Sequence, residues 1–181
     1  MAAELPAQRV RRVVLTGSES TGKTTLARRL AKHYGTVASR EFVREYAVAR
    51  HNQLGFEDHG PIARGQMAAE DEAAAAARRV VFLDTDLVST ALYCDHYYGR
   101  CPRWIEDTAA ERAGDLYLLM NVDVPRVPDP ARDRGDRRDE MHALFRGRLE
   151  AMRLPYVEIS GDWDQRFAAA VRAVDALLAG P

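Results

Sequence analysis

Apolar runs and segments with helical spacing alternate along the chain. The runs are short and continuous, as in parallel strands that are buried on both faces. They occupy residues 10–16, 80–83, 115–120 and 157–160, with a shorter candidate at 36–39. The spacing of apolar residues between these runs predicts helices at 24–34, 41–50, 57–79, 87–98, 102–113, 141–152 and 163–178.

This alternation defines the expected fold class. Consecutive parallel strands need crossover connections, which are right-handed and place helices on the faces of the sheet. We therefore predict an α/β three-layer sandwich with a five-stranded parallel sheet and a small lid. Residues 1–9 are expected to form a flexible tail, and residues 10–181 a single domain whose lid spans about residues 123–138.

The segment between the first predicted strand and the first predicted helix has the form of a phosphate-binding loop. Residues 17–24 read G-S-E-S-T-G-K-T, which matches the pattern G-x-x-x-x-G-K-T in the expected strand–loop–helix setting. Glycines let consecutive backbone N–H groups face an anion, and the following helix directs its positive end at that anion. The alternative is a plain turn, but the setting favours a nucleoside triphosphate site.

Each part of this loop has an expected role toward the nucleotide. Lys23 would reach the β- and γ-phosphates, and the hydroxyl of Thr24 would ligate Mg²⁺. The expected cofactors are therefore ATP and Mg²⁺. The predicted nucleotide-binding residues are Gly17, Glu19, Ser20, Thr21, Gly22, Lys23, Thr24 and Thr25.

Acidic residues follow the strand at 80–83. Ligands bind at the carboxyl ends of parallel strands, which gathers residues 17–24, 39–45, 84–86 and 121–134 at one edge. Asp84 ends its strand where P-loop proteins hold Mg²⁺, so Thr24 and Asp84 are the predicted metal ligands. Asp86 would point into the same cleft as a catalytic group, or would cap the helix that begins near Leu87.

Charged residues also follow the candidate strand at 36–39. Such a run is usually a solvated helix face, but its place at the end of a strand favours function. The carboxylate of Glu41 could accept a hydroxyl proton, and Arg44 could orient the acceptor or the transferring phosphate.

The segment 123–138 is rich in proline and arginine. Its aspartates nearly balance its arginines, so a solvated loop is the alternative interpretation. A lid at this place would exclude water from the γ-phosphate and bring arginines to the charge that develops during transfer. We expect Arg132 to act in catalysis, with Arg126 and Arg134 as the next candidates.

Composition excludes several classes of protein. The chain is 46% hydrophobic and 29% charged with a net charge of −1, which favours an ordinary globular protein over a binder of nucleic acid or membranes. No apolar run is long enough for a membrane span, and Cys94 and Cys101 are expected to be reduced thiols. We expect a cytoplasmic protein, and a homo-oligomer is possible.

Taken together, these segments resemble the ribosylnicotinamide kinase family, the kinase portion of the NadR-type bifunctional proteins of NAD salvage. The resemblance implies a P-loop kinase-type domain that transfers the γ-phosphate of ATP to the ribose 5′-hydroxyl of nicotinamide riboside, giving the mononucleotide. Because the chain leaves no room for the adenylyltransferase and DNA-binding portions of such proteins, we expect a stand-alone kinase. The matching segments are residues 17–24, Glu41-x-x-Arg44-Glu45, Ile62-Ala63-x-Gly65-Gln66, 82–86 with Thr90, Val127-x-Asp129-x-x-Arg132 and 155–159.

The resemblance implies substrate contacts from the lid as well. The implied substrate-binding residues are Glu41, Arg44, Asp84, Asp86, Arg126 and Asp129. Arg126 and Pro130 stand where the family commonly has Trp and Gly. An aromatic residue there would suit stacking on a nicotinamide ring, and Tyr93, Tyr97, Tyr98 or Trp104 could replace it or simply pack in the core.

The sequence therefore predicts an ATP-dependent kinase for a small nucleoside, with nicotinamide riboside as the first candidate. An acidic group, Glu41 or Asp86, would position or deprotonate the acceptor hydroxyl. One alternative is a kinase for a deoxynucleoside, a mononucleotide or another alcohol. The other is a regulatory NTPase, which would direct hydrolysis at water.

Overall fold

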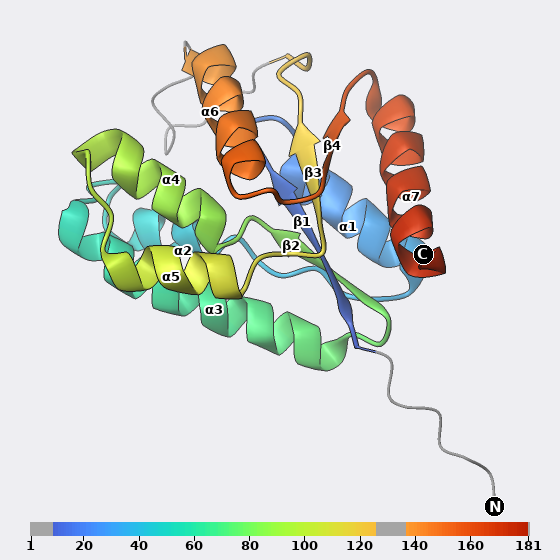
Figure 1. The fold of residues 1–181 in the computed structure, drawn as a ribbon, viewed down its shortest axis with the longest axis horizontal. Helices are drawn as coiled ribbons and strands as arrows, with labels where there is room; N and C mark the ends of the chain where they lie inside the picture. The colour runs from blue at the N-terminus through green and yellow to red at the C-terminus, as the bar shows by residue number, and fades with distance from the viewer. Residues whose placement is uncertain (1–8, 126–136, 181) are drawn as a thin grey trace, which may run out of the picture.

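A parallel sheet lies at the centre of the computed structural model, which describes residues 9–125 and 137–180 (Figure 1). The strand order is β2-β1-β3-β4. The strands are β1 (Arg11–Thr16), β2 (Val80–Asp84), β3 (Leu116–Met120) and β4 (Tyr156–Ile159). The helices are α1 (Lys23–Tyr34), α2 (Phe42–Ala49), α3 (His59–Ala76), α4 (Leu87–Tyr98), α5 (Arg103–Glu111), α6 (Arg138–Ala151) and α7 (Trp163–Ala179), with a 3₁₀ turn at Phe56–Asp58.

The predicted α/β architecture is confirmed, but the prediction of five strands is wrong for the described residues. Residues 36–39 do lie at the sheet edge beside β2, where Ala38 forms a single parallel bridge with Phe82. Pairing goes no further because the hydroxyl of Ser39 accepts the backbone N–H of Asp84 at 3.0 Å. The chain then turns away into α2 at Phe42, so this segment never forms a regular strand.

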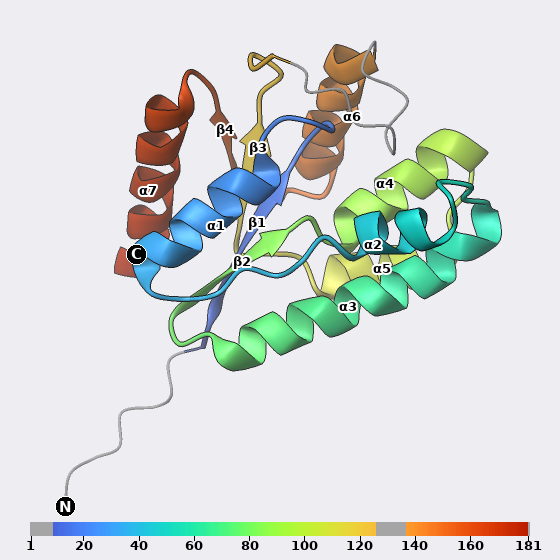
Figure 2. The ribbon, with the colours of Figure 1, turned by 180° about the vertical axis from the view of Figure 1, so that it is seen from behind.

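Helices cover both faces of the sheet. Alternate residues of each strand point to opposite faces, so Val13 and Leu15 pack against α1 and α7, whereas Val14 packs among residues of α3 to α6. Figure 1 shows α6 in front of the sheet, and the reverse view in Figure 2 brings α1 forward. No helix in the described ranges combines the length and hydrophobicity that a membrane span requires.

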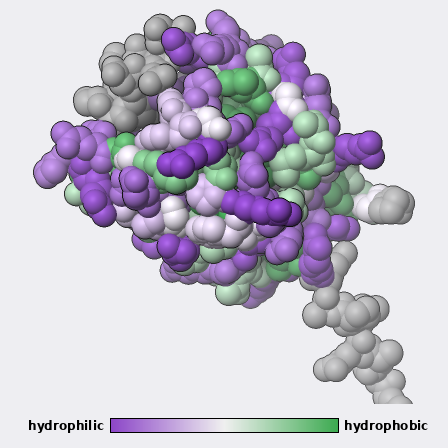
Figure 3. All heavy atoms as spheres, turned by 60° about the vertical axis from the view of Figure 1, so that its left-hand side comes forward, coloured by the Kyte–Doolittle hydropathy of each residue, from purple (hydrophilic) through white to green (hydrophobic). Residues whose placement is uncertain are grey.

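The face of the molecule shown in Figure 3 is mainly hydrophilic. Polar side chains cover most of the face shown in Figure 3, and hydrophobic residues appear as patches between them. The exposed aromatic residues include Tyr97, Tyr98 and Trp104, which lie on α4 and α5.

The order of the strands creates a cleft at their carboxyl ends. From β1 the chain moves to β2 on one side, and then crosses to β3 on the other side of β1. In open parallel sheets, such a reversal of direction leaves a crevice outside the carboxyl ends of the strands. The segments that follow β1, β2 and β3 therefore meet at one edge.

A buried tyrosine connects β3 to the start of α4. Tyr117 is fully buried, and its hydroxyl donates to Asp86 at 2.6 Å and accepts the backbone N–H of Gly114 at 3.1 Å. Asp86 in turn caps α4 by accepting the backbone N–H of Ser89 at 3.3 Å. These bonds fix the direction in which α4 leaves the sheet.

We predict that Tyr117→Phe lowers the free energy of unfolding by about 1–3 kcal/mol, because it leaves the Gly114 N–H and an Asp86 oxygen buried without this hydroxyl. Urea denaturation measures the loss. The control is Tyr156→Phe, which removes an exposed hydrogen bond to Glu150 and should change stability by less than about 0.5 kcal/mol. Equal losses in the two variants would contradict the prediction.

Candidate active site

The phosphate loop closes around the ammonium group of Lys23. Its Nζ donates to the carbonyl oxygens of Gly17 at 3.0 Å and Ser18 at 2.6 Å. Gly17 has a φ of 120°, and a Cβ at this position would lie 2.9 Å from the Met120 carbonyl oxygen. The loop therefore requires glycine here, and α1 begins at Lys23 with its N-terminus directed into the loop.

The predicted metal ligands are neighbours. The Thr24 hydroxyl donates to the Asp84 carboxylate at 2.5 Å, which joins the start of α1 to the end of β2. Mg²⁺ prefers oxygen ligands, and this hydroxyl–carboxylate pair beside a phosphate loop supplies them. The donor set therefore fits Mg²⁺.

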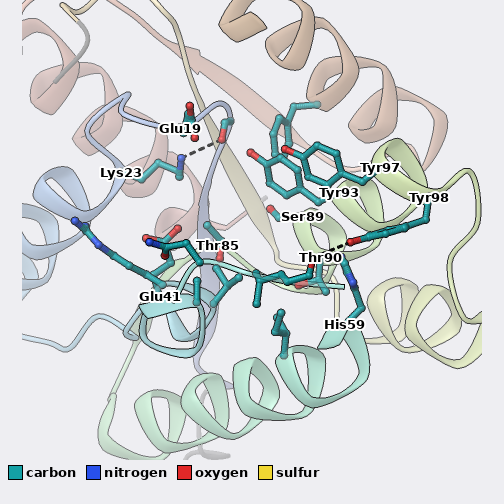
Figure 4. Close-up of a pocket in the computed structure, with 18 residues that line it drawn as sticks. Glu19, Lys23, Glu41, His59, Thr85, Ser89, Thr90, Tyr93, Tyr97 and Tyr98 are labelled. Carbon is teal, nitrogen blue, oxygen red and sulfur yellow. Dashed lines mark hydrogen bonds between the residues drawn. The ribbon is translucent and has the colours of Figure 1, made fainter. Parts of the chain in front are cut away.

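A cavity of about 570 Å³ opens beside the loop (Figure 4). This volume is in the range of small-molecule sites. The loop and α2 supply its charged residues, and α4 supplies most of its aromatic ones. The lining residues include Gly17, Glu19, Lys23, Glu41, Arg44, Thr85, Ser89, Thr90, Tyr93, Tyr97 and Tyr98.

Aromatic rings form one wall of this cavity. Tyr93 and Tyr97 lie one turn apart on α4, and their rings stack with 5.8 Å between centroids and an interplanar angle of 14°. Phe145 of α6 meets the edge of Tyr93 with a centroid distance of 5.6 Å. Of the four aromatic candidates, Trp104 is the one that does not line the cavity and instead lies under the guanidinium of Arg64.

The structure separates the two carboxylates that the sequence left as alternatives. Glu41 lines the cavity at the start of α2, but Asp86 does not line it. Asp86 is 3% exposed, and its oxygens accept bonds from Tyr117 and from the N-terminus of α4. Burial raises the pKa of Asp86, although these hydrogen bonds act in the opposite direction. Asp86 thus takes the helix-capping position.

A buried arginine that the sequence did not mark supports the loop from behind. Arg166 of α7 is fully buried, and it donates to the carbonyl oxygens of Thr21 at 3.0 Å, Asn121 at 3.0 Å and Gly161 at 2.8 Å. It also pairs with the carboxylate of Asp123. One side chain therefore joins the phosphate loop, the end of β3 and the start of α7.

Residues near the predicted lid also contact the loop. Arg138 donates to the carbonyl oxygens of Ser20 at 3.3 Å and Val124 at 3.2 Å, and its own carbonyl accepts the Ser18 hydroxyl at 2.6 Å. The sequence analysis placed this arginine at the end of the predicted lid and gave it no role of its own. The predicted lid residues Arg126, Asp129, Arg132 and Arg134 lie outside the described residues.

The fold and the phosphate loop define a P-loop nucleotide-binding protein of kinase type. A family model described as an AAA domain matches residues 12–166, and the chain belongs to this family.

The curated relatives confirm the resemblance seen in the sequence. The trifunctional NAD biosynthesis/regulator protein NadR of Escherichia coli K12 is 32% identical, and that of Salmonella typhimurium LT2 is 31% identical. Each comparison covers 93% of this chain and 43% of the relative. The chain thus spans less than half the length of these relatives.

Solved structures agree with this assignment. A NadR protein in complex with NR is similar with a TM-score of 0.83 and 27% identity, over 96% of this chain and 51% of that chain. Another NadR structure, in complex with NAD and AMP-PNP, has a TM-score of 0.80 and 26% identity with the same coverage. Deoxyadenosine kinase from M. mycoides shares the fold, with a TM-score of 0.66 and 10% identity over 91% of this chain and 99% of that chain.

We predict that Arg166→Lys weakens binding of a non-hydrolysable ATP analogue and lowers the free energy of unfolding by about 1–3 kcal/mol. The ammonium group of lysine cannot donate to the carbonyl oxygens of Thr21, Asn121 and Gly161 at the same time, as the planar guanidinium group of Arg166 does. Isothermal titration and denaturant unfolding measure the two effects. Arg29→Lys is the matched control, because Arg29 pairs with the exposed Asp164 and should change stability by less than about 0.5 kcal/mol. Unchanged nucleotide affinity in Arg166→Lys would contradict the prediction.

Proposed function

We propose that this protein transfers the γ-phosphate of ATP to the ribose 5′-hydroxyl of nicotinamide riboside, giving nicotinamide mononucleotide. The observation that supports this most directly is the single cavity shared by Lys23 of the phosphate loop, Glu41 of α2 and the tyrosines of α4. The similarity to NadR proteins, one of them solved in complex with NR, supports the choice of acceptor.

In this proposal the loop side of the cavity binds the triphosphate. The backbone N–H groups of the loop and the Lys23 ammonium would hold the β- and γ-phosphates. Thr24 and Asp84 would hold Mg²⁺, which would neutralise charge on the phosphate oxygens. The lid arginines proposed for the transferring phosphate are Arg132 first and Arg126 next, with Asp129 as a substrate contact.

The opposite side of the cavity would bind the acceptor. The carboxylate of Glu41 would accept or orient the 5′-hydroxyl proton, and Arg44 would hold the ribose or the phosphate in transfer. The acceptor carries a flat, positively charged pyridinium ring, which is attracted to the electron-rich faces of aromatic side chains. Tyr93 and Tyr97 supply such faces in the wall of the same cavity.

The activity test combines the purified protein with ATP, Mg²⁺ and nicotinamide riboside, and follows product by mass spectrometry. We expect the mononucleotide and ADP in equal amounts. Parallel reactions contain deoxynucleosides, mononucleotides or no acceptor. Product from another acceptor but none from nicotinamide riboside would reject this substrate, and ATP hydrolysis that needs no acceptor would favour a regulatory NTPase.

We predict that Lys23→Ala lowers turnover by about 10³-fold, because the ammonium group no longer stabilises the transferring phosphate. Circular dichroism should show an unchanged fold. The control is Lys32→Ala, an exposed lysine at the other end of α1, which should retain normal activity. Normal activity in Lys23→Ala would remove the central assignment.

We predict that Glu41→Gln lowers kcat by about 10²-fold or more while the KM for ATP changes by less than about twofold. An amide cannot take the hydroxyl proton, although it has nearly the same shape. Steady-state kinetics with each substrate varied in turn measure both constants. Glu45→Gln, which makes the same change to an exposed α2 residue paired with Arg40, should behave as wild type. Equal kcat values for the two variants would exclude this role for Glu41.

A further inference from the structure

One motif of the sequence has no part in the proposed chemistry. Residues 62–66 lie in α3. Among them, the side chain of Gln66 is buried, and this residue is only 1% exposed. A buried glutamine must satisfy its amide group, because burial without hydrogen bonds is costly. Its partners therefore show what the residue does.

The Gln66 amide connects two walls of the cavity. Its Nε2 donates to the carbonyl oxygen of Thr85 at 3.2 Å, and its Oε1 accepts the backbone N–H of Phe42 at 3.4 Å. Nε2 also lies 3.4 Å from a carboxylate oxygen of Glu70. Thr85 follows the predicted metal ligand Asp84, and Phe42 follows Glu41, so the amide spans from one functional segment to the other.

The Thr85 end of this contact is a strained turn. Thr85 has a φ of 69°, in the left-handed region that β-branched residues avoid. Its N–H donates to the Leu15 carbonyl at 3.1 Å, and its carbonyl faces Gln66. Strained backbone of this kind persists only where the surroundings hold it. Gln66 is one of the groups that hold it.

The Phe42 end is the first turn of α2. The first N–H groups of a helix lack partners within the helix, and the Glu41 side chain does not cap α2. Gln66 accepts the N–H of Phe42, the first residue of this helix. The Phe42 ring also lies where a Cβ on Gly65 would be, so the glycine permits α2 to approach α3 this closely.

We propose that Gln66, with Gly65 beside it, is a positioning residue that sets the place of Glu41 relative to the Asp84–Asp86 turn. This inference rests on the proposed function for its kinetic consequence. Gln66 itself does not line the cavity, so it acts through the backbone of Phe42 and Thr85. Figure 4 shows Glu41 and Thr85 on the cavity wall that these contacts hold.

The first test is independent of activity. In the full chain, Gln66→Met keeps the length of the side chain but removes the hydrogen bonds to Phe42, Thr85 and Glu70. We expect the Phe42 amide to exchange its hydrogen about tenfold faster than in wild type, as followed by NMR. Gln53→Met, which makes the same change on an exposed side chain, should leave that rate unchanged. An unchanged Phe42 rate in Gln66→Met would overturn the proposal.

The second test is kinetic. We expect Gln66→Met to lower kcat by about 10- to 100-fold through a displaced Glu41, with the KM for ATP within about twofold of wild type. Equal loss of affinity for ATP and of kcat would indicate general damage to the domain and would overturn the positioning role. If wild-type protein fails to phosphorylate nicotinamide riboside, the proposed function is rejected instead. The exchange rate of the Phe42 amide then still shows whether Gln66 holds the start of α2.

A rescue variant separates positioning from general stability. Glycine adopts a φ near 69° without strain. In a Thr85→Gly variant, the turn should therefore depend less on the hydrogen bond from Gln66 to keep its conformation. We expect Gln66→Met to lower kcat about fivefold less in the Thr85→Gly background than in wild type. Independent effects of the two substitutions would exclude coupling through this turn.

Discussion

The hydrogen bond between the Thr24 hydroxyl and the Asp84 carboxylate joins the two parts on which the candidate site depends. Thr24 belongs to the first turn of α1, and Asp84 is the last residue of β2, the strand next to β1. The bond therefore sets the distance between the phosphate loop and the carboxyl end of the neighbouring strand. Both groups offer oxygen to Mg²⁺, so the two groups that join α1 to β2 are also the ones that a metal ion would use.

The two sides of the cavity are held in different ways. Backbone carbonyls of the loop surround Lys23. Arg166 binds the loop from behind through the Thr21 carbonyl, and it also binds the carbonyls of Asn121 and Gly161. The side proposed for the acceptor depends on side chains that reach across elements, such as Gln66 between α2 and the Thr85 turn. Phosphoryl transfer requires in-line geometry more than covalent assistance, so small shifts on the acceptor side should affect rate strongly.

Local patterns were enough to predict the loop, the strand that ends at Asp84 and nearly every helix, because glycines, apolar runs and helical spacing act within a few residues. Local patterns did not predict the structure where residues far apart in the sequence determine it. Residues 36–39 stop short of a strand because Ser39 binds Asp84. The sequence left Asp86 and Glu41 as alternatives because the choice depends on Tyr117, which is far along the chain. The sequence did not mark Arg166, because its partners Thr21, Asn121 and Asp123 lie far away along the chain.

The phosphate loop and the aromatic wall of the cavity differ in how tightly the surrounding structure constrains them. The phosphate loop is constrained by glycines and buried carbonyls, so few substitutions there preserve the fold. The aromatic wall is different, because Tyr93 and Tyr97 lie one turn apart on α4 and their rings stack on each other. Replacing one flat ring there alters the surface offered to the base, while Gln66 and Asp84 keep Glu41 and the loop in place. In the proposed function, the aromatic wall would face the acceptor's base and the loop would face the triphosphate, so the base could vary more readily than the transfer chemistry.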